Sequence, residues 1–157
     1  MNRHELSRSV TTESGPEPKT VQSQAEQEYR AVLAIVLEVL GGRHPITLAV
    51  RNGIAYVLTE QARYGEAERA YRKVLAVRRE VLGEHHPDTL TVRNGVAYVL
   101  AEQGRHGEAE QEFREILAVR REVLGEHHPR TLTTRRSLEA VQQVRDEDLG
   151  LRPLWEL

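Results

Sequence analysis

The segment from Ile54 to Leu75, IAYVLTEQARYGEAERAYRKVL, returns 42 residues later as VAYVLAEQGRHGEAEQEFREIL at 96–117. The likeness extends over 41–82 and 83–124, which align without gaps and are identical at 29 of 42 positions. Self-similarity at one fixed period of this length is typical of repeat architectures. The sequence therefore contains two full repeats, and partial copies flank them on both sides.

Each repeat reads as a pair of helices. In the second copy, apolar residues keep helical spacing over 90–100 and again over 109–124, and Gly104 interrupts the pattern between them. Pro87 is suited to the first turn of a helix, and Gly125 to the position just after a helix ends. One helix pair cannot bury its apolar face alone, so neighbouring pairs must stack. The sequence predicts an all-α solenoid of about six antiparallel helices.

These residues resemble the tetratricopeptide repeat family. The small residues of its helix contacts match Ala55, Ala67, Ala97 and Ala109. Its aromatic position on the second helix matches Tyr71 and Phe113, and its turn glycine matches Gly104. The 42-residue period and the motif LGEHHPDTL at 82–90 are most similar to the long repeats of kinesin light chains and of many actinobacterial proteins. The resemblance covers about 25–145 and implies a right-handed superhelix that binds protein or peptide without catalysis. Gly53 and Gly95 depart from the family pattern, which often has Asn there.

The remaining chain suggests specialised ends. We expect a flexible polar tail at 1–21, a half repeat at 22–40, the full repeats 41–82 and 83–124, a capping helix at 129–145 and a C-terminal tail at 146–157. Glu139 stands in the column of a buried alanine, as a cap allows. The tail is expected to pack Leu151, Leu154 and Trp155 over the open end of the stack. Alternatively, it imitates the Trp-acidic segments that kinesin light-chain repeats recognise.

The first helix is more apolar than its copies. Val36 and Leu37 occupy the columns of Arg78 and Arg79, which we expect, like Arg120, on the convex or edge surface. The polar stretch before residue 22 offers little to cover an apolar stripe. The sequence thus suggests self-association as an alternative function, with a tail folded back over the stripe as the competing interpretation. The residues concerned are Val32, Ile35, Val36 and Leu37.

The concave surface of such a solenoid is the expected binding site. First helices line this groove in the family, and their asparagines and tyrosines suit the backbone and side chains of an extended peptide. The predicted groove residues are Asn52, Tyr56, Thr59, Glu60, Thr91, Asn94, Tyr98, Glu102 and Arg136. Arginines that stand where shorter repeats often carry Trp are candidate anion contacts, namely Arg51, Arg93 and Arg135.

The paired histidines of GEHHPDTL at 83–90 and GEHHPRTL at 125–132 raise the question of a metal site. A zinc ion needs three or four ligands that converge within about 2.1 Å, and copies one helix pair apart are too distant for that. We therefore interpret the histidines as structural connectors. Phosphate-loop, nucleophile-elbow and HExxH motifs are absent from the sequence, and we expect no cofactor, no metal and no enzymatic activity.

Composition narrows the partners. The formal net charge is −2 and glutamates alternate with the arginines, which argues against nucleic acid. There is no cysteine, so disulfides and thiolate chemistry are excluded. The N-terminus lacks an apolar signal region, and the most apolar run, at 31–40, is too short to span a bilayer. We expect a cytoplasmic protein whose partner is another protein or a peptide.

Overall fold

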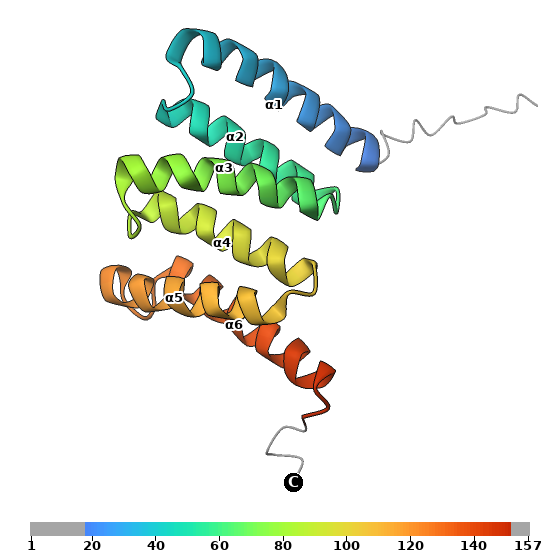
Figure 1. Cartoon of the computed structure of the whole chain (residues 1–157), viewed down its shortest axis with the longest axis vertical. Helices are drawn as coiled ribbons and strands as arrows, with labels where there is room; N and C mark the ends of the chain where they lie inside the picture. Colours follow the sequence, from blue (N-terminus) through green and yellow to red (C-terminus); the bar gives the residue numbers. More distant parts are fainter. Residues whose placement is uncertain (1–17, 152–157) are drawn as a thin grey trace, which may run out of the picture.

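The computed structural model describes residues 18–151, which form six α-helices stacked in chain order (Figure 1). The helices are α1 Pro18–Leu40, α2 Pro45–Glu60, α3 Tyr64–Leu82, α4 Pro87–Glu102, α5 His106–Leu124 and α6 Pro129–Asp148. Each helix packs on the next, so the predicted all-α solenoid is confirmed. Helix α1 starts four residues before its expected beginning, and α6 ends three residues later than expected. The predicted tails lie mostly outside the described residues, as do Leu154 and Trp155, while Leu151 is exposed.

The connectors explain why the histidine motif was repeated. The Nδ1 atoms of His44, His86 and His128 accept hydrogen bonds from the backbone N–H groups two residues ahead, at 3.2, 3.1 and 3.2 Å. Each histidine therefore caps a helix whose first residue is proline. Gly83 and Gly125 end the preceding helices at φ of 90° and 89°, a conformation that favours glycine.

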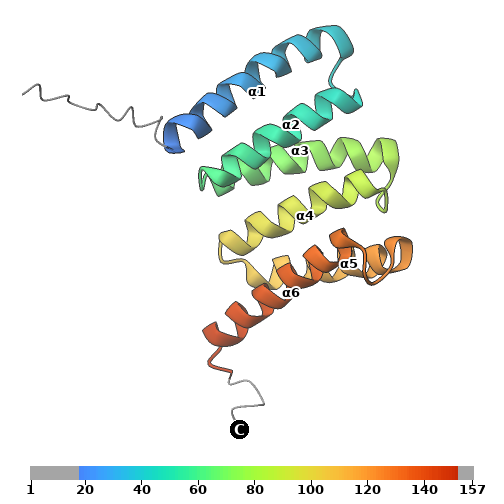
Figure 2. The ribbon, with the colours of Figure 1, turned by 180° about the vertical axis from the view of Figure 1, so that it is seen from behind.

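The helices form two layers (Figure 2). Helices α2 and α4 approach each other, as do α4 and α6, and we call these three the inner layer. Helices α1, α3 and α5 form the outer layer, and they contact inner helices but not one another. The stack is therefore tighter on the inner side, and hollows remain between successive outer helices.

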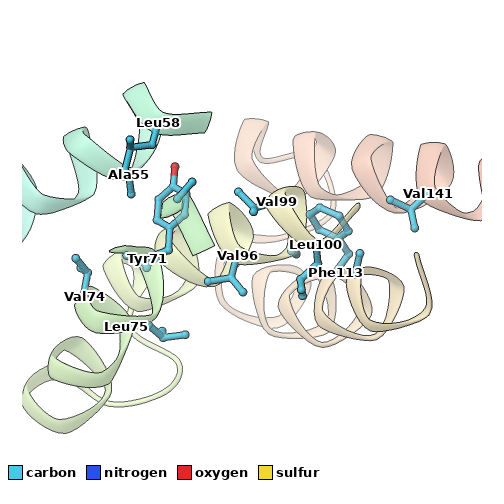
Figure 3. Packing of buried hydrophobic residues seen from close by; sticks show 14 of the residues in the cluster. Ala55, Leu58, Tyr71, Val74, Leu75, Val96, Val99, Leu100, Phe113 and Val141 are labelled. Carbon is cyan, nitrogen blue, oxygen red and sulfur yellow. The ribbon is translucent and has the colours of Figure 1, made fainter. Parts of the chain in front are cut away.

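Small and aromatic residues meet where the layers cross. Ala55, Ala67, Ala97 and Ala109 are fully buried, which lets the helix backbones come close. Tyr71 of α3 points toward α2 and is buried in the core, while Phe113 lies beside Leu100 and Val141 (Figure 3). A Cβ atom on Gly95 would lie 2.8 Å from the ring of Tyr71, and one on Gly53 would lie 2.4 Å from the ring of Tyr29. The two glycines that depart from the family pattern thus make room for tyrosines of the outer layer.

Two arginines correct the expectation of a solvated outer edge. Arg78 and Arg120 are buried rather than exposed. The Nη1 atom of Arg78 donates to the backbone oxygen of Asp88 at 2.7 Å, and that of Arg120 donates to the oxygen of Arg130 at 3.1 Å. Each guanidinium therefore joins an outer helix to the start of the next inner helix. Val36 lies in the same column and is half-buried, so it does not replace a solvated residue.

Candidate binding groove

Two exposed tyrosines mark the surface of the inner layer. Tyr56 of α2 and Tyr98 of α4 are 57% and 46% exposed although they are large aromatic residues. Glu60 and Glu102 follow them by four residues, hence on the same faces of their helices, and both are exposed. Since α2 and α4 are neighbours in the inner layer, these four side chains form one surface of aromatic rings and carboxylates.

Side chains of this surface interact with one another, and these interactions shift the pKa values of two tyrosines. The hydroxyl of Tyr64 donates to Oε2 of Glu102 at 3.1 Å, and this hydrogen bond raises the pKa of Tyr64. Burial raises the pKa of Tyr98, and the negative charges of Glu102 and Glu60 raise it further. Within residues 21–151 neither Glu60 nor Glu102 forms an ion pair. The surface is acidic and aromatic, a combination that attracts a cationic side chain.

The character of this surface changes toward α6. A hollow of about 220 Å³ opens beside Tyr98, and its walls include Phe113, Ala140 and Val144. Ala140 and Val144 occupy the repeat columns of Tyr98 and Glu102. The same repeat positions that are aromatic and acidic on α4 are therefore apolar on α6.

The predicted groove residues divide into three groups. The exposed members are Tyr56, Glu60, Thr91, Tyr98, Glu102 and Arg136. Asn52 and Asn94 are half-buried, and Thr59 is buried. Thr59 cannot line the groove, because its hydroxyl lies in the core and donates to the backbone oxygen of Ala55 at 2.9 Å. Tyr64 and Val144 were not predicted as part of this surface. The sequence does show that both positions differ between repeats, since the copy of Tyr64 is His106 and Val144 stands in the column of Glu102.

Of the two asparagines, Asn94 forms a hydrogen bond between helices and Asn52 does not. Oδ1 of Asn94 accepts a hydrogen bond from the hydroxyl of Thr134 at 3.2 Å, which joins α4 to α6. Asn52 is its copy one repeat earlier, but Val92 stands in the column of Thr134. Oδ1 of Asn52 is consequently buried without a hydrogen-bond partner among the described residues.

The three candidate anion contacts differ in their partners and in their surroundings. Arg93 is buried and forms ion pairs with Glu84, Glu112 and Glu115, so its guanidinium is already compensated and is not open to a ligand. Arg135 pairs with Glu126. Within residues 21–151, Arg51 donates only to the backbone oxygen of Gly42, and it faces a hollow of the outer layer rather than the groove.

An apolar stripe is exposed on α1, and it includes Val32 and Ile35 of the four predicted residues. Val32, Ile35 and Val39 are 45%, 63% and 72% exposed, whereas Val36 and Leu37 are half-buried. In α3 the copy of Val32 is Val74, which is fully buried. The stripe on α1 thus includes a position that the next repeat keeps inside its core, and no described residue covers it.

Two further structural findings concern metals and membranes. Over residues 21–151, no three His, Asp or Glu side chains come together as ligands for a metal ion. None of the six described helices combines the length and the apolar character that a membrane span needs.

Comparison with known proteins agrees with the architecture. The family model described as "Tetratricopeptide repeat" matches residues 23–80, 49–122 and 88–149. A crystal structure titled "Podosopora anserina putative kinesin light chain nearly identical TPR-like repeats" superposes with a TM-score of 0.75 at 22% identity, over 85% of this chain and 63% of that one. A crystal structure of a single-substitution variant of the same repeats superposes with a TM-score of 0.67 at 22% identity, over 88% of this chain and 65% of the other. The chain thus spans just under two thirds of the length of either structure.

No curated protein matches the chain in sequence at a significant level. The likeness to the kinesin light-chain repeats is one of fold, because the identity is low. The family model, in contrast, spans nearly the whole described region, with its matches offset by successive repeats. With its histidine-capped helix pairs and its 42-residue period, the chain belongs to the tetratricopeptide repeat family.

Proposed function

We propose that the chain is a non-catalytic scaffold whose inner groove binds an extended segment of another protein. Tetratricopeptide repeats form helical scaffolds that typically serve protein interaction. The observation that carries the proposal is the pair of exposed tyrosines, Tyr56 and Tyr98, beside carboxylates that have no ion-pair partner among the described residues. The ligand inferred from this surface carries a basic side chain next to an apolar one.

The two parts of the groove suggest an order for these side chains. A Lys or Arg over the rings of Tyr56 and Tyr98 gains cation–π attraction and reaches Glu60 or Glu102. An aliphatic side chain then fits the apolar hollow between Tyr98 and Val144. Because inner helices follow one another at helix-packing distance, one extended segment of a few residues spans both parts.

Selection from a display library of random short peptides tests this proposal. We expect enriched peptides to combine a basic residue with a nearby aliphatic one. Tyr98→Ala is expected to weaken the best peptide about tenfold, because it removes the ring from both parts of the groove. Isothermal titration calorimetry measures the dissociation constants, and thermal unfolding checks that the variant is folded.

A matched control is Val123→Ala, which shortens an exposed apolar side chain on the outer layer. This variant should bind like the unmodified chain. Enrichment of acidic peptides, or equal binding by Tyr98→Ala and Val123→Ala, would contradict the proposed groove.

Self-association is a second candidate function, and the apolar stripe of α1 supports it. Val32, Ile35 and Val39 lie three and four residues apart, which is the spacing of a helix–helix seam. The opposite end of the stack is a poor complement, since α6 presents the exposed Glu139 in the column of the buried Ala97. A two-fold contact of α1 with α1 of a second copy is therefore favoured over head-to-tail assembly.

Sedimentation velocity at several concentrations tests this second candidate. The unmodified chain should form dimers, and Ile35→Arg with Val39→Arg should be monomeric, because charges would then stand in the seam. Substitutions at Val36 and Leu37 are less informative, since those side chains are half-buried in the fold. An unmodified chain that stays monomeric at high concentration would eliminate this candidate.

A further inference from the structure

The outer layer contains a large hollow between α1 and α3. Its volume is about 630 Å³, and α2 forms its floor. Four cationic side chains line it, namely Arg30, Arg51, Arg69 and Lys73, together with the single carboxylate of Glu66. We call it the first outer hollow. The second outer hollow lies one repeat further on, between α3 and α5.

Glu112 lines the second outer hollow and forms an ion pair with the buried Arg93. The side chain of Arg93 is 4% exposed, and a buried guanidinium needs compensation by negative charge. Its Nη1 lies 3.1 Å from Glu84, its Nε donates to Glu112 at 3.0 Å, and its Nη2 lies 2.6 Å from Glu115. Three carboxylates therefore surround one arginine.

The first outer hollow is lined by the equivalent arginine of the preceding repeat, Arg51, which lacks these partners. Arg51 is the copy of Arg93, but Gly42, Ala70 and Lys73 occupy the columns of Glu84, Glu112 and Glu115. All three carboxylates are thus missing, and one is replaced by a cation. Among the described residues, the one side-chain hydrogen bond of Arg51 runs from Nη1 to the backbone oxygen of Gly42 at 3.3 Å.

The other charges leave the first outer hollow positive. Arg30 pairs with Glu26, and Glu66 pairs with Arg63. Within residues 21–151, neither Arg51 nor Arg69 nor Lys73 forms an ion pair with a carboxylate. Three uncompensated cations on two helices consequently face one hollow that is open to solvent.

We propose that the first outer hollow is a binding site for a compact dianion, either a phosphate group or a pair of carboxylates. The ligand takes the place that Glu112 and Glu115 occupy around Arg93. Arg51 offers a planar fork of donors from the floor, and Arg69 and Lys73 add charge from the wall of α3. This site lies in the outer layer and is independent of the groove proposed on the inner layer.

The internal copy supplies the decisive variant. Ala70→Glu with Lys73→Glu gives the first outer hollow the two helix carboxylates of the second. Ala70 is half-buried and Lys73 is exposed on α3, and glutamate is a good helix former, so the fold should persist. The new carboxylates should neutralise Arg51 internally and exclude an external anion.

Separate titrations with inorganic phosphate and with succinate test the proposal. The readouts are the NMR signals of the arginine Nε–H groups and the melting temperature. At constant ionic strength set with chloride, we expect the Nε–H signal of Arg51 to shift saturably and the melting temperature to rise. Ala70→Glu with Lys73→Glu should raise the dissociation constant at least about tenfold. The dianion with the lower dissociation constant identifies the chemistry of the ligand.

A control variant carries the same change of charge at the far end of the stack. Arg130→Glu with Thr133→Glu lowers the net charge by three, as the test variant does, at exposed positions of α6. It should bind the dianion like the unmodified chain. The proposal is overturned if neither dianion shifts the Nε–H signal of Arg51 more than chloride does. It is also overturned if the two double variants bind the dianion with equal dissociation constants.

Discussion

The repeats 41–82 and 83–124 share most of their residues and yet differ in what surrounds one arginine. Their common positions cap the helices, fill the core and place Arg51 and Arg93 at equivalent points of the stack. Among the few differences are all three carboxylates that compensate Arg93. The shared positions thus include those that stacking needs, whereas the carboxylates around this arginine are present in one repeat and absent from the other.

This comparison also makes the chain its own control. A substitution at one position can be judged against the same substitution 42 residues away, because the backbone and most neighbours are alike. Effects at equivalent sites in different repeats should be nearly additive where the side chains share no contacts.

The largest effect is expected when the second outer hollow receives the residues of the first. Glu112→Ala with Glu115→Lys leaves buried Arg93 with Glu84 alone and adds a cation beside it. Removing the partners of a buried charge typically costs about 3 kcal/mol or more in unfolding free energy. Urea denaturation measures the loss, which phosphate should partly restore. The reverse exchange at Ala70 and Lys73 should not destabilise the chain, and equal losses in both variants would contradict the comparison.

The next effect concerns the glycines that face tyrosine rings. Gly95→Ala places a methyl group 2.8 Å from the ring of Tyr71, which is buried and cannot move away. Overpacking should cost about 2 kcal/mol and outweigh the gain of up to about 1 kcal/mol in helix propensity. Gly53→Ala should cost less although its clash is closer, because Tyr29 is partly exposed and can swing outward. A larger loss for Gly53→Ala in urea denaturation would show this reasoning to be wrong.

Local features of the fold could be predicted from the sequence, whereas contacts between helices could not. The period, the Pro87 and Gly125 boundaries and the six helices followed from local patterns, which the structure confirms. The role of Arg93 did not, because Glu112 and Glu115 approach it from 19 and 22 residues away. Such contacts depend on how two helices face each other, which residue type alone does not specify.

The candidate groove residues show the same difference between features of residue type, which could be predicted, and helix packing, which could not. Tyr56 and Tyr98 were predicted because aromatic residues stand out in aliphatic helices, and both are exposed, while their binding role stays a prediction. Thr59 was misplaced, since its helix turns this side chain into the core. The contact of Asn94 with Thr134 joins two helices of adjacent repeats, so it became visible only once their packing was known.

A smaller effect should distinguish the two histidines of one connector. His86→Ala removes the Nδ1 acceptor that caps α4 and should cost about 1 kcal/mol. His85→Ala changes an exposed neighbour that forms no hydrogen bond to the helix start, and it should leave the unfolding free energy unchanged within error. Urea denaturation of both variants compares them directly. The capping role is wrong if the two substitutions cost the same.

The smallest effect tests the turn between the helices of each repeat. Ala62 adopts φ of 57° where its copy Gly104 adopts 76°, so one repeat holds an alanine in the left-handed region. Ala62→Gly should relieve about 1–2 kcal/mol of steric cost but lose about 0.4–1 kcal/mol through the freer unfolded chain. A net stabilisation of about 0.5–1 kcal/mol is therefore expected in urea denaturation, and Gly104→Ala should produce a loss of similar size. If Ala62→Gly instead destabilises the chain, the contacts of the Ala62 methyl group outweigh its backbone strain, and the two turns are not equivalent despite their matching positions.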